Sequence, residues 1–544
     1  MGAEDRAVAL ARVASGLASG AGVELPAGLW LWRLAGGRPR AEAQPSADPA
    51  ADLGAALERT LTDRQRRRGA HYTPAPLAER IAALALPRPA PLPVVDPACG
   101  AGALLLAVGR RLVDAGVPAV AVARDLLWGC DIDPIAAATT EAAIALWSGG
   151  TAPGPGHLVA ADALRSGAAA WPDPPATGFG AVVANPPFQG QLAAATARPA
   201  AEQAALRARF GDAMSAYADS AALFLLLGIE LCRPGGRVAM VQPTSTASSR
   251  DAGATRRAVA DRARLVDLVV PDAATFAANV HVCLPVLEVG EPDPDPSWSL
   301  RLAGARGVPR VVVAVHRTVG DLAGAVGGFR QHYYGLVGHV HEARSDDVAA
   351  LVTSGLIDVG ASHWGRRPVR FARAIWERPA VDLPGVARDA PAVGAWLERL
   401  RRPKVLVATQ TRVTEAAADR TGTWVPCTPV VSVVPHDPAD VDRLAAVLCA
   451  PPVAAWAVGR MGGSGLSAAA IRTSTALALA APLPPDRGAW EDASAALVAG
   501  ELDRFAERAT AMYRLDRDDA AAVLTWWHGA RPANRVLGPA QAAR

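Results

Sequence analysis

The stretch that decides the fold runs from residue 179 to residue 188 and reads Phe-Gly-Ala-Val-Val-Ala-Asn-Pro-Pro-Phe. Its apolar, valine-containing part predicts a buried strand over residues 181–184. The strand must end at Asn185, because neither Pro186 nor Pro187 can donate a hydrogen bond to a sheet. Open α/β sheets bind ligands at the carboxyl ends of their strands. We therefore expect Asn185 to lie at a ligand site.

The four residues that follow this strand suit one kind of acceptor, a planar exocyclic amino group. The side-chain oxygen of Asn185 and the carbonyl oxygen of Pro186 can both accept hydrogen bonds from such a group. Two acceptors favour the pyramidal nitrogen that attacks a methyl donor. Phe188 adds a flat face on which a base can stack. Taken alone, the stretch is also compatible with a strand that merely ends in a Pro-Pro turn.

Three further strands are predicted upstream, and each ends at an aspartate. Residues 93–106 (PVVDPACGAGALLL) predict a strand ending at Asp96, a turn containing Gly100 and Gly102, and then a helix. The glycines allow the backbone to approach a ligand closely, but no Gly-Lys-Ser/Thr follows, so a phosphate loop is not expected. A second strand ends at Asp131, whose carboxylate could accept from both hydroxyls of a ribose.

The third of these strands spans residues 157–161 and ends at Asp162, which could accept from the amino group of a cofactor adenine. Near the second strand, Asp133 precedes Pro134 and suits a helix N-cap instead. Single acidic strand ends are common. Four polar strand ends at one edge of a sheet indicate a binding site.

Composition excludes several classes of protein. The chain has 544 residues, a formal net charge of +3 and 51% hydrophobic residues, which argues against a histone-like or disordered protein. Its six cysteines are scattered without a CxxC pair, so neither a zinc site nor a disulfide scaffold is expected. The longest apolar run, residues 221–232, predicts a helix too short to span a bilayer. The helix that contains this run is predicted to end at Pro234-Gly235-Gly236, before a strand over residues 237–242.

The chain is predicted to divide into five parts. A helical N-terminal segment (1–60) precedes a catalytic domain (61–290), a connecting segment (291–328), a recognition domain (329–487) and a C-terminal helical segment (488–544). Residues 329–377 interleave aromatic residues with arginines, a pattern that suits a nucleic-acid surface. Residues 403–436 predict two or three antiparallel strands.

The order of these motifs resembles that of the gamma-class DNA amino-methyltransferases, which methylate adenine N6. The matching motifs are Tyr72-Thr73-Pro74, residues 96–102, Asp131, Asp162 and residues 185–188, and the resemblance covers about residues 60–290. It implies an α/β fold: a Rossmann-like S-adenosylmethionine-dependent methyltransferase domain with a mixed seven-stranded sheet. A helical N-terminal segment and an α+β C-terminal target-recognition domain would flank it. The C-terminal half resembles such recognition domains more loosely, through a Gly-Gly-Ser-Gly loop at residues 462–465.

The resemblance also implies the site residues. Thr73 and the turn from Asp96 to Gly102 would hold the methionine part of S-adenosylmethionine, Asp131 its ribose and Asp162 its adenine. Phe188 and Phe276 would stack on the target base, although Phe276 could equally be a core residue. The full cofactor set is Tyr72, Thr73, Asp96, Pro97, Ala98, Cys99, Gly100, Gly102, Asp131, Ile132, Asp162 and Ala163, and the catalytic set is Asn185, Pro186, Pro187 and Phe188.

The sequence departs from the family pattern at two places. Ala163 stands where relatives often have an aromatic residue, which should weaken that contact with the cofactor adenine. Gly180 and Ala184 replace the Asp and Gly that often occupy this strand, and Ala184 narrows the space beside Asn185.

We thus expect an enzyme that methylates N6 of a flipped-out adenine in double-stranded DNA, in a restriction-modification or phage-defence system. It would be cytoplasmic, associated with the nucleoid when bound to DNA, with no membrane partner and no metal. A common nuclease site needs an acid two residues before a lysine, but Arg402 precedes Lys404, the only lysine. Any nuclease is therefore expected on a partner protein. The alternatives are an amino-methyltransferase acting on RNA or on a protein glutamine, and a non-catalytic DNA-binding subunit.

Overall fold

A computed structural model describes most of the chain, and it divides into two compact units, Met1–Trp298 and Ser299–Arg544. Each unit is described by itself, and the finer division into five parts stays a prediction. The described residues are 2–62, 73–188, 200–214, 219–249, 251–271, 281–294, 297–313, 315–346, 348–461, 470–485 and 487–531.

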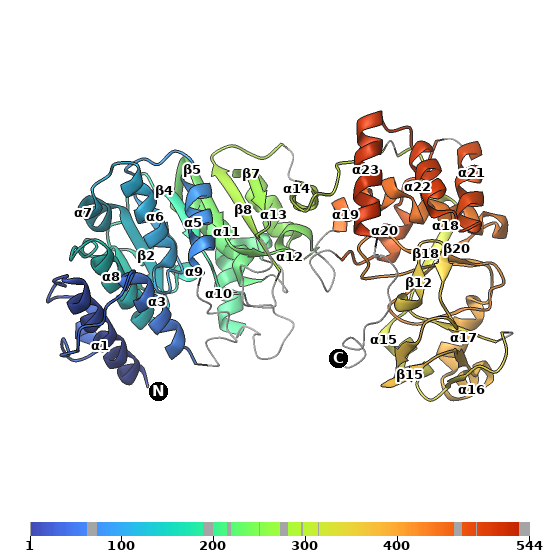
Figure 1. Ribbon diagram of the computed structural model, residues 1–544, viewed down its shortest axis with the longest axis horizontal. Coiled ribbons are helices and arrows are strands. Elements are labelled where there is room, and N and C mark those ends of the chain that lie inside the picture. Colours follow the sequence, from blue (N-terminus) through green and yellow to red (C-terminus); the bar gives the residue numbers. More distant parts are fainter. Residues whose placement is uncertain are drawn as a thin grey trace. The chain divides into compact units, whose positions relative to one another are not determined.

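The first unit is built on one mixed sheet (Figure 1). Its strands lie in the order β3-β2-β1-β4-β5-β8, and β7 pairs with the outer side of β8. The five strands from β3 to β5 are parallel, whereas β8 runs antiparallel to both β5 and β7. The bounds are β1 Val94–Asp96, β2 Leu127–Asp131, β3 Leu158–Ala160, β4 Phe179–Ala184, β5 Cys232–Met240, β7 Ala263–Val269 and β8 Val282–Val289. This confirms the predicted Rossmann-like α/β fold.

An eighth strand, β6 (Gln242–Pro243), extends the predicted set of seven. It pairs with β8 in the register that β5 uses, since Ala239 faces Val286 and Gln242 faces Cys283. β6 is therefore the continuation of β5 after a break at one residue, and the sheet keeps its seven-stranded plan.

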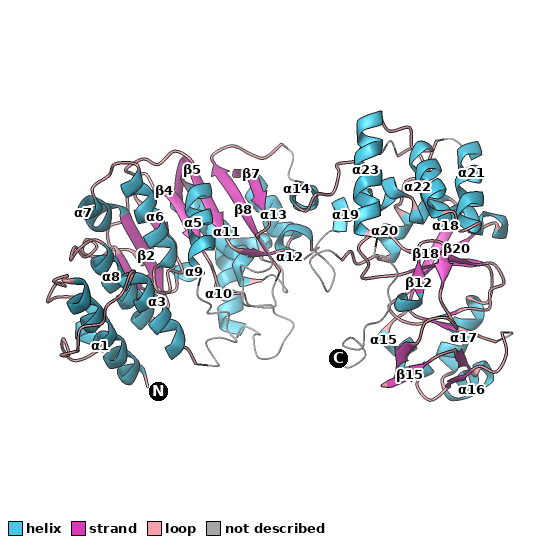
Figure 2. Cartoon of the chain, in the orientation of Figure 1, coloured by secondary structure: helices cyan, strands magenta, loops and turns pink. Residues whose placement is uncertain are grey.

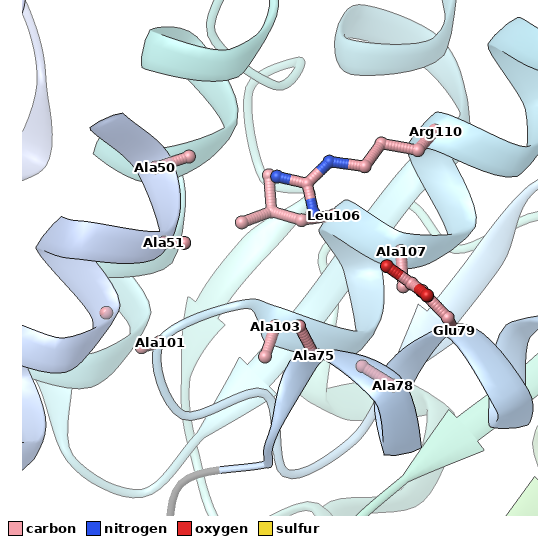
Figure 3. A pocket seen from close by; sticks show the side chains of 11 residues that line it. Ala50, Ala51, Ala75, Ala78, Glu79, Ala101, Ala103, Leu106, Ala107 and Arg110 are labelled. Atoms are coloured by element: carbon pink, nitrogen blue, oxygen red, sulfur yellow. The ribbon is translucent and has the colours of Figure 1, made fainter. Parts of the chain in front are cut away.

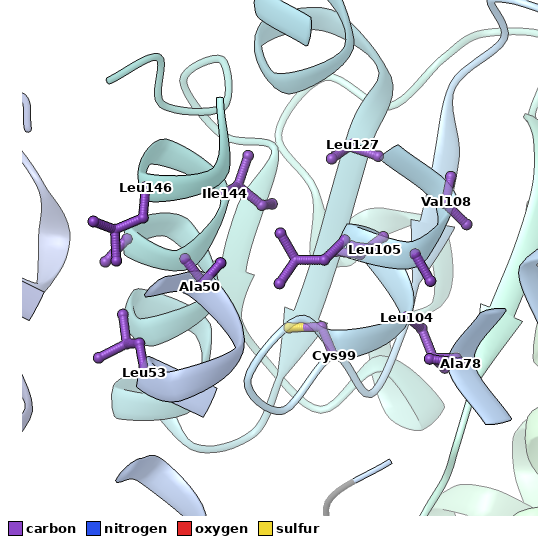
Figure 4. Close-up of a cluster of buried hydrophobic side chains, with 14 of the residues drawn as sticks. Ala50, Leu53, Ala78, Cys99, Leu104, Leu105, Val108, Leu127, Ile144 and Leu146 are labelled. Carbon is purple, nitrogen blue, oxygen red and sulfur yellow. The ribbon is translucent and has the colours of Figure 1, made fainter. Parts of the chain in front are cut away.

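Helices cover both faces of this sheet (Figure 2). α5 (Ala75–Ala85), α6 (Ala103–Asp114) and α8 (Pro134–Trp147) bury leucines and alanines against β1, β2 and β4 in one continuous core (Figure 4). On the other face, Gly228 of α11 (Ser220–Leu231) lies directly against Val238 and Met240 of β5. The remaining helices of this unit are α7 Ala119–Ala121, α9 Ala163–Ser166, α10 Ala200–Phe210, α12 Ser245–Ser248 and α13 Gly253–Ala260.

The N-terminal segment forms α1 (Ala3–Ala21), α2 (Trp30–Leu34) and α3 (Pro49–Thr60), as predicted. These helices share the core of α5, α6 and α8. Trp32 is buried and donates its indole N–H to the carbonyl of Pro26 at 3.0 Å. The segment is therefore part of the first unit and lies against its sheet-covering helices.

The second unit holds an antiparallel sheet in the order β18-β17-β20-β9, which confirms the antiparallel strands predicted over residues 403–436. Lys404 and Asp419 face each other in adjacent strands as a fully buried ion pair. Asp419 also accepts from the backbone N–H groups of Gly422 and Trp424, each at 2.9 Å. The sole lysine is thus tied to a structural partner. The four strands are β9 Ala323–Gly327, β17 Lys404–Val407, β18 Ala416–Asp419 and β20 Val431–Pro435.

Eight short strands in the second unit pair two by two: β10 Val340–Glu342 with β16 Pro379–Val381, β11 Leu351–Val352 with β19 Val425–Pro426, β12 Ile357–Asp358 with β13 Ala361–Ser362, and β14 Val369–Phe371 with β15 Ala374–Trp376. The helices are α14 Trp298–Ala305, which begins at the last residue of the first unit, α15 Arg330–Leu336, α16 Leu383–Asp389, α17 Pro391–Arg399, α18 Val441–Cys449, α19 Pro451–Met461, α20 Thr475–Leu479, α21 Arg487–Val498, α22 Leu502–Ala511 and α23 Arg517–Ala530.

None of the described helices is, by itself, long and apolar enough to cross a membrane. Pro438–Cys449 and Pro451–Met461 together meet the length and composition, but they are bent by 62° at the break between them.

Candidate active site

Four polar residues lie at the carboxyl ends of four neighbouring parallel strands. Asp162 follows β3, Asp131 ends β2, Asp96 ends β1 and Asn185 follows β4. Because the strand order is β3-β2-β1-β4, these residues form one staggered row at the same edge of the sheet. Asp131 lies two positions beyond Gly129, the partner of Asp96, and Asp162 lies two positions beyond Ala160, the partner of Asp131. The polar strand ends thus share one edge, as predicted, but they are not in register.

Asp96 is the most deeply buried member of the row, with 1% of its surface exposed. Its Oδ1 accepts from the backbone N–H of Ala98 at 2.9 Å. Burial raises its pKa from 3.8 to about 8, opposed by the Ala98 hydrogen bond and reinforced by the nearby charge of Asp131. Asp96 is thus largely protonated at neutral pH while no cation is near it.

The turn after Asp96 is shaped by two glycines at positive φ, Gly100 at +55° and Gly102 at +84°. Gly102 begins α6, and a Cβ there would lie 3.0 Å from a methyl carbon of Thr140. The Thr140 hydroxyl in turn donates to the Gly100 carbonyl at 2.8 Å. This turn therefore requires glycine for both its conformation and its packing.

Asp131 connects this turn to the start of α8. Its Oδ2 accepts from the Gly100 N–H at 2.9 Å, and its Oδ1 accepts from the Asp133 N–H at 2.8 Å. Burial raises the pKa of Asp131 to about 6, and these backbone hydrogen bonds limit the rise. The carboxylate is held in a fixed orientation beside the turn.

The loop that carries Asp131 has a contact that the sequence did not suggest, an ion pair between Asp133 and Arg6. Asp133 caps α8 by accepting from the Ile135 N–H at 3.0 Å, which confirms its predicted capping role. Its other oxygen, Oδ2, accepts from Nη2 of Arg6 at 3.0 Å. Arg6 lies on α1 and is 6% exposed. A buried arginine of the N-terminal segment thus braces the loop that carries Asp131.

Asp162 and its neighbour occupy the end of the row. Asp162 caps α9, accepting from the Arg165 N–H at 3.4 Å, and Ala163 is buried at the start of that helix. On the loop after β2, Ile132 is 74% exposed. An exposed isoleucine next to Asp131 offers an apolar surface to a ligand at this edge.

Asn185 has a partner that no local pattern predicted. Its Nδ2 donates to the hydroxyl of Thr73 at 3.0 Å, across 112 positions of sequence. Thr73 is buried, whereas Asn185 is partly exposed. With the nitrogen engaged by Thr73, the Oδ1 of Asn185 has no hydrogen-bond partner among the described residues and can accept from a ligand.

The residues after Asn185 present one buried proline and two half-buried side chains. Pro186 is buried, and Phe188 is partly exposed while packing against the core of the unit. Its ring is therefore fixed on the protein side. Tyr72 and Phe276 lie outside the described residues, as does the Gly-Gly-Ser-Gly loop.

The thiol in the turn is not placed for nucleophilic chemistry. Cys99 is buried, and its backbone N–H donates to the Cys130 carbonyl at 2.9 Å. Burial, and the nearby carboxylates of Asp131 and Asp96, raise the pKa of this thiol well above its usual range. Cys99 therefore stays protonated and packs as an apolar side chain.

A small cavity lies close to the turn but is a separate feature (Figure 3). It contains none of the four polar strand ends. Arg110 on its wall is paired with Asp48 at 2.6 Å, which leaves Glu79 as its other charged group. We attribute the cavity to the small side chains that α3, α5, α6 and the turn before α6 place there: Ala50, Ala51, Gly54, Ala75, Ala78, Ala101, Ala103 and Ala107.

Comparison with known proteins defines the class of the first unit. Residues 52–297 match the family described as N-6 DNA Methylase, which confirms for this part of the chain the class that its motifs predicted. No curated protein matches the chain.

Among solved structures, the type IIL restriction-modification enzyme MmeI in complex with DNA is similar at a TM-score of 0.53 and 13% identity, over 93% of this chain and 81% of that one. The two share a fold over both units. Two others are the type IIG restriction endonuclease BpuSI (TM-score 0.42, 12% identity, 97% and 78% covered) and a modification subunit of a putative type I restriction enzyme from Vibrio vulnificus YJ016 (0.35, 20%, 48% and 53%).

Proposed function

We propose that the chain transfers a methyl group from S-adenosylmethionine to N6 of an adenine flipped out of double-stranded DNA. We place it in a restriction-modification or phage-defence system of the cytoplasm, with any nuclease on a partner protein. The family match of residues 52–297 supports DNA N6 methylation. The observation that carries the residue-level proposal is the orientation of Asn185, whose amide nitrogen is held by Thr73 while its oxygen remains available.

The residues at the sheet edge fit the cofactor. Asp131 is a fixed carboxylate that can accept from a ribose diol, and exposed Ile132 can pack on an adenine. The glycine turn would let the backbone approach the methionine part, which Thr73 and Asp96 would help to hold. When bound, the cofactor supplies an electrophilic methyl group on a sulfonium centre.

The protein's part in the reaction is to make the adenine amino group reactive. Its nitrogen lone pair is delocalised into the ring, which makes it a weak nucleophile. Asn185 Oδ1 and the Pro186 carbonyl accept from its two hydrogens and favour a pyramidal nitrogen, while Phe188 stacks on the base. The nitrogen would form the new N–C bond as the S–CH3 bond of the sulfonium breaks, which would release S-adenosylhomocysteine, and one N6 proton would then pass to solvent. A protonated Cys99 takes no part.

Two variants test this assignment. Asn185→Ala should reduce methyl transfer at least about a hundredfold while leaving cofactor affinity nearly unchanged, because the acceptor for the amino group is lost. Asp131→Asn should instead weaken cofactor binding, measured by calorimetry. Unchanged transfer in Asn185→Ala would remove the catalytic role.

The acceptor is tested with the full-length chain in a host that lacks adenine methylation. We expect N6-methyladenine at a defined motif, detected by genome-wide mapping. Labelled methyl groups arriving in RNA or in a protein glutamine, with none in DNA, would replace the proposal with one of those activities. An absence of cofactor binding would favour a non-catalytic DNA-binding subunit.

A further inference from the structure

The β14–β15 hairpin of the second unit has an unusual turn. Two residues, Ala372 and Arg373, connect its strands, and both have positive φ, +49° and +67°. Two-residue hairpin turns of this kind favour Asn-Gly, because side chains other than glycine are disfavoured there by about 1 kcal/mol or more each. Strain of this type persists where the surrounding structure fixes it and where function makes use of it.

The surrounding structure does fix this turn. The backbone N–H of Ala372 donates to the hydroxyl of Tyr333 on α15 at 3.2 Å. The Tyr333 ring also lies 5.0 Å from the ring of Phe371, which is buried. On the opposite strand, Trp376 donates its indole N–H to the Phe371 carbonyl at 3.1 Å. The hairpin is therefore a rigid projection, and α15 lies beside it (Figure 1).

The outer side of the hairpin is cationic and apolar. Arg370 and Ile375 face each other across the two strands; Arg370 is exposed and Ile375 is 60% exposed. Arg373 stands exposed at the turn and has no ion-pair partner among the described residues. Residues 363–376 contain four arginines and no acidic residue.

Arg367, in the same stretch, makes the contacts expected of an arginine with a structural role. Arg367 is mostly buried and donates to Asp358 at 2.9 Å and to the Gly355 carbonyl at 2.8 Å. Arg373 makes neither kind of contact. Its presence on a strained turn is therefore not explained by the stability of the unit.

We propose that this hairpin enters a groove of duplex DNA and that Arg373 contacts a base edge there. The inference rests on the proposed function and names its sequence-reading element. A two-stranded β-ribbon fits the major groove, where an arginine can donate two hydrogen bonds to a guanine. Ile375 offers an apolar contact to a thymine methyl group, and the local excess of arginine matches the charge of the phosphate backbone.

The test compares full-length variants for the methylated motif and for affinity toward a duplex that carries it. Arg373→Ala should weaken binding to that duplex by about 5- to 150-fold, the range of one base contact, and make one position of the motif degenerate. The matched control is Arg388→Ala, which removes an arginine from α16 that is 72% exposed and paired with Asp389. It should leave the motif unchanged and alter the affinity less than about twofold.

A third variant tests the positioning of the turn separately from the contact that Arg373 makes with DNA. Tyr333→Phe removes the hydroxyl that accepts from the turn and keeps the ring, so it should weaken DNA binding by a smaller factor than Arg373→Ala, with cofactor affinity unchanged. A motif and an affinity in Arg373→Ala equal to those of Arg388→Ala would overturn the inference. So would an affinity loss that is uniform across sequences, since that indicates a phosphate contact. If the wild-type chain methylates no DNA, the proposed function fails first and the inference with it.

Discussion

Asp96→Asn should stabilise the first unit, and the gain should grow as pH rises. The pKa of Asp96 is raised from 3.8 to about 8 in the folded chain, mainly by burial. Between those values the folded state binds one more proton than the unfolded state, so stability falls with rising pH by about 1.4 kcal/mol per unit. The loss is about 3 kcal/mol at pH 6 and about 6 kcal/mol at pH 9, and it levels off above the folded pKa. Asparagine does not titrate and can still accept from the Ala98 N–H.

The assay is native-state hydrogen exchange of the cofactor-free chain, read on peptides from β1, β2 and β4, because the chain has two units and a single unfolding transition is not assumed. The stability difference between Asp96→Asn and wild type should widen by about 2–3 kcal/mol from pH 6 to pH 9. The control is Asp114→Asn, which removes a carboxyl group from the exposed end of α6, away from the sheet edge. A constant difference for Asp96→Asn would refute the reasoning.

Two further variants address the residues that stand behind the site. Thr73→Val removes the hydroxyl that accepts from Asn185. The methylation rate at saturating cofactor should therefore fall about five- to tenfold, as for the loss of one orienting hydrogen bond. A weaker cofactor affinity at an unchanged rate would instead assign Thr73 to the methionine part. Arg6→Met removes the ion pair with Asp133, so the cofactor dissociation constant, measured by calorimetry, should rise about three- to tenfold. The control, Arg12→Met at an exposed position of the same helix, should leave this constant unchanged. Equal constants in the two variants would contradict a supporting role for Arg6.

Much of the catalytic sheet could be predicted because its signals are local. Two prolines after Ala184 end β4, and the strand does stop there. Asp96 and Asp131 likewise end their strands, as predicted from an apolar run that is followed by an acidic residue. Parallel pairing then brings both strand ends to the same edge of the sheet, with Asp131 two positions beyond Gly129, the partner of Asp96. The family match confirms the class that these motifs indicated for residues 52–297.

One local prediction was wrong in its boundary. The apolar helix was expected to run to Pro234-Gly235-Gly236, but α11 ends at Leu231 and these residues belong to β5. Cys232 already pairs with Phe179, and the register shifts before Arg237 pairs with Ala181. A proline and two glycines usually break structure, but a bulged strand end accommodates them.

The unpredicted parts are contacts between distant residues. Asn185 and Thr73 are 112 positions apart, and Arg6 and Asp133 are 127 apart. In an arginine-rich chain a single arginine carries little information, so nothing local distinguished Arg6 from its exposed neighbours. Arg6 differs from these neighbours because it is buried. Its burial depends on how α1 packs, which a local sequence pattern does not predict.

The pKa values of Asp96 and Asp131 are both raised chiefly by burial, and one ligand at the sheet edge could lower both. Asp96 and Asp131 end adjacent paired strands, and burial disfavours the charged form of each carboxylate. A ligand that brings positive charge to this edge would lower both pKa values and recover the stability that burial removes. An edge that disfavours charged carboxylates when it is empty therefore favours a ligand that brings positive charge or donates hydrogen bonds to them.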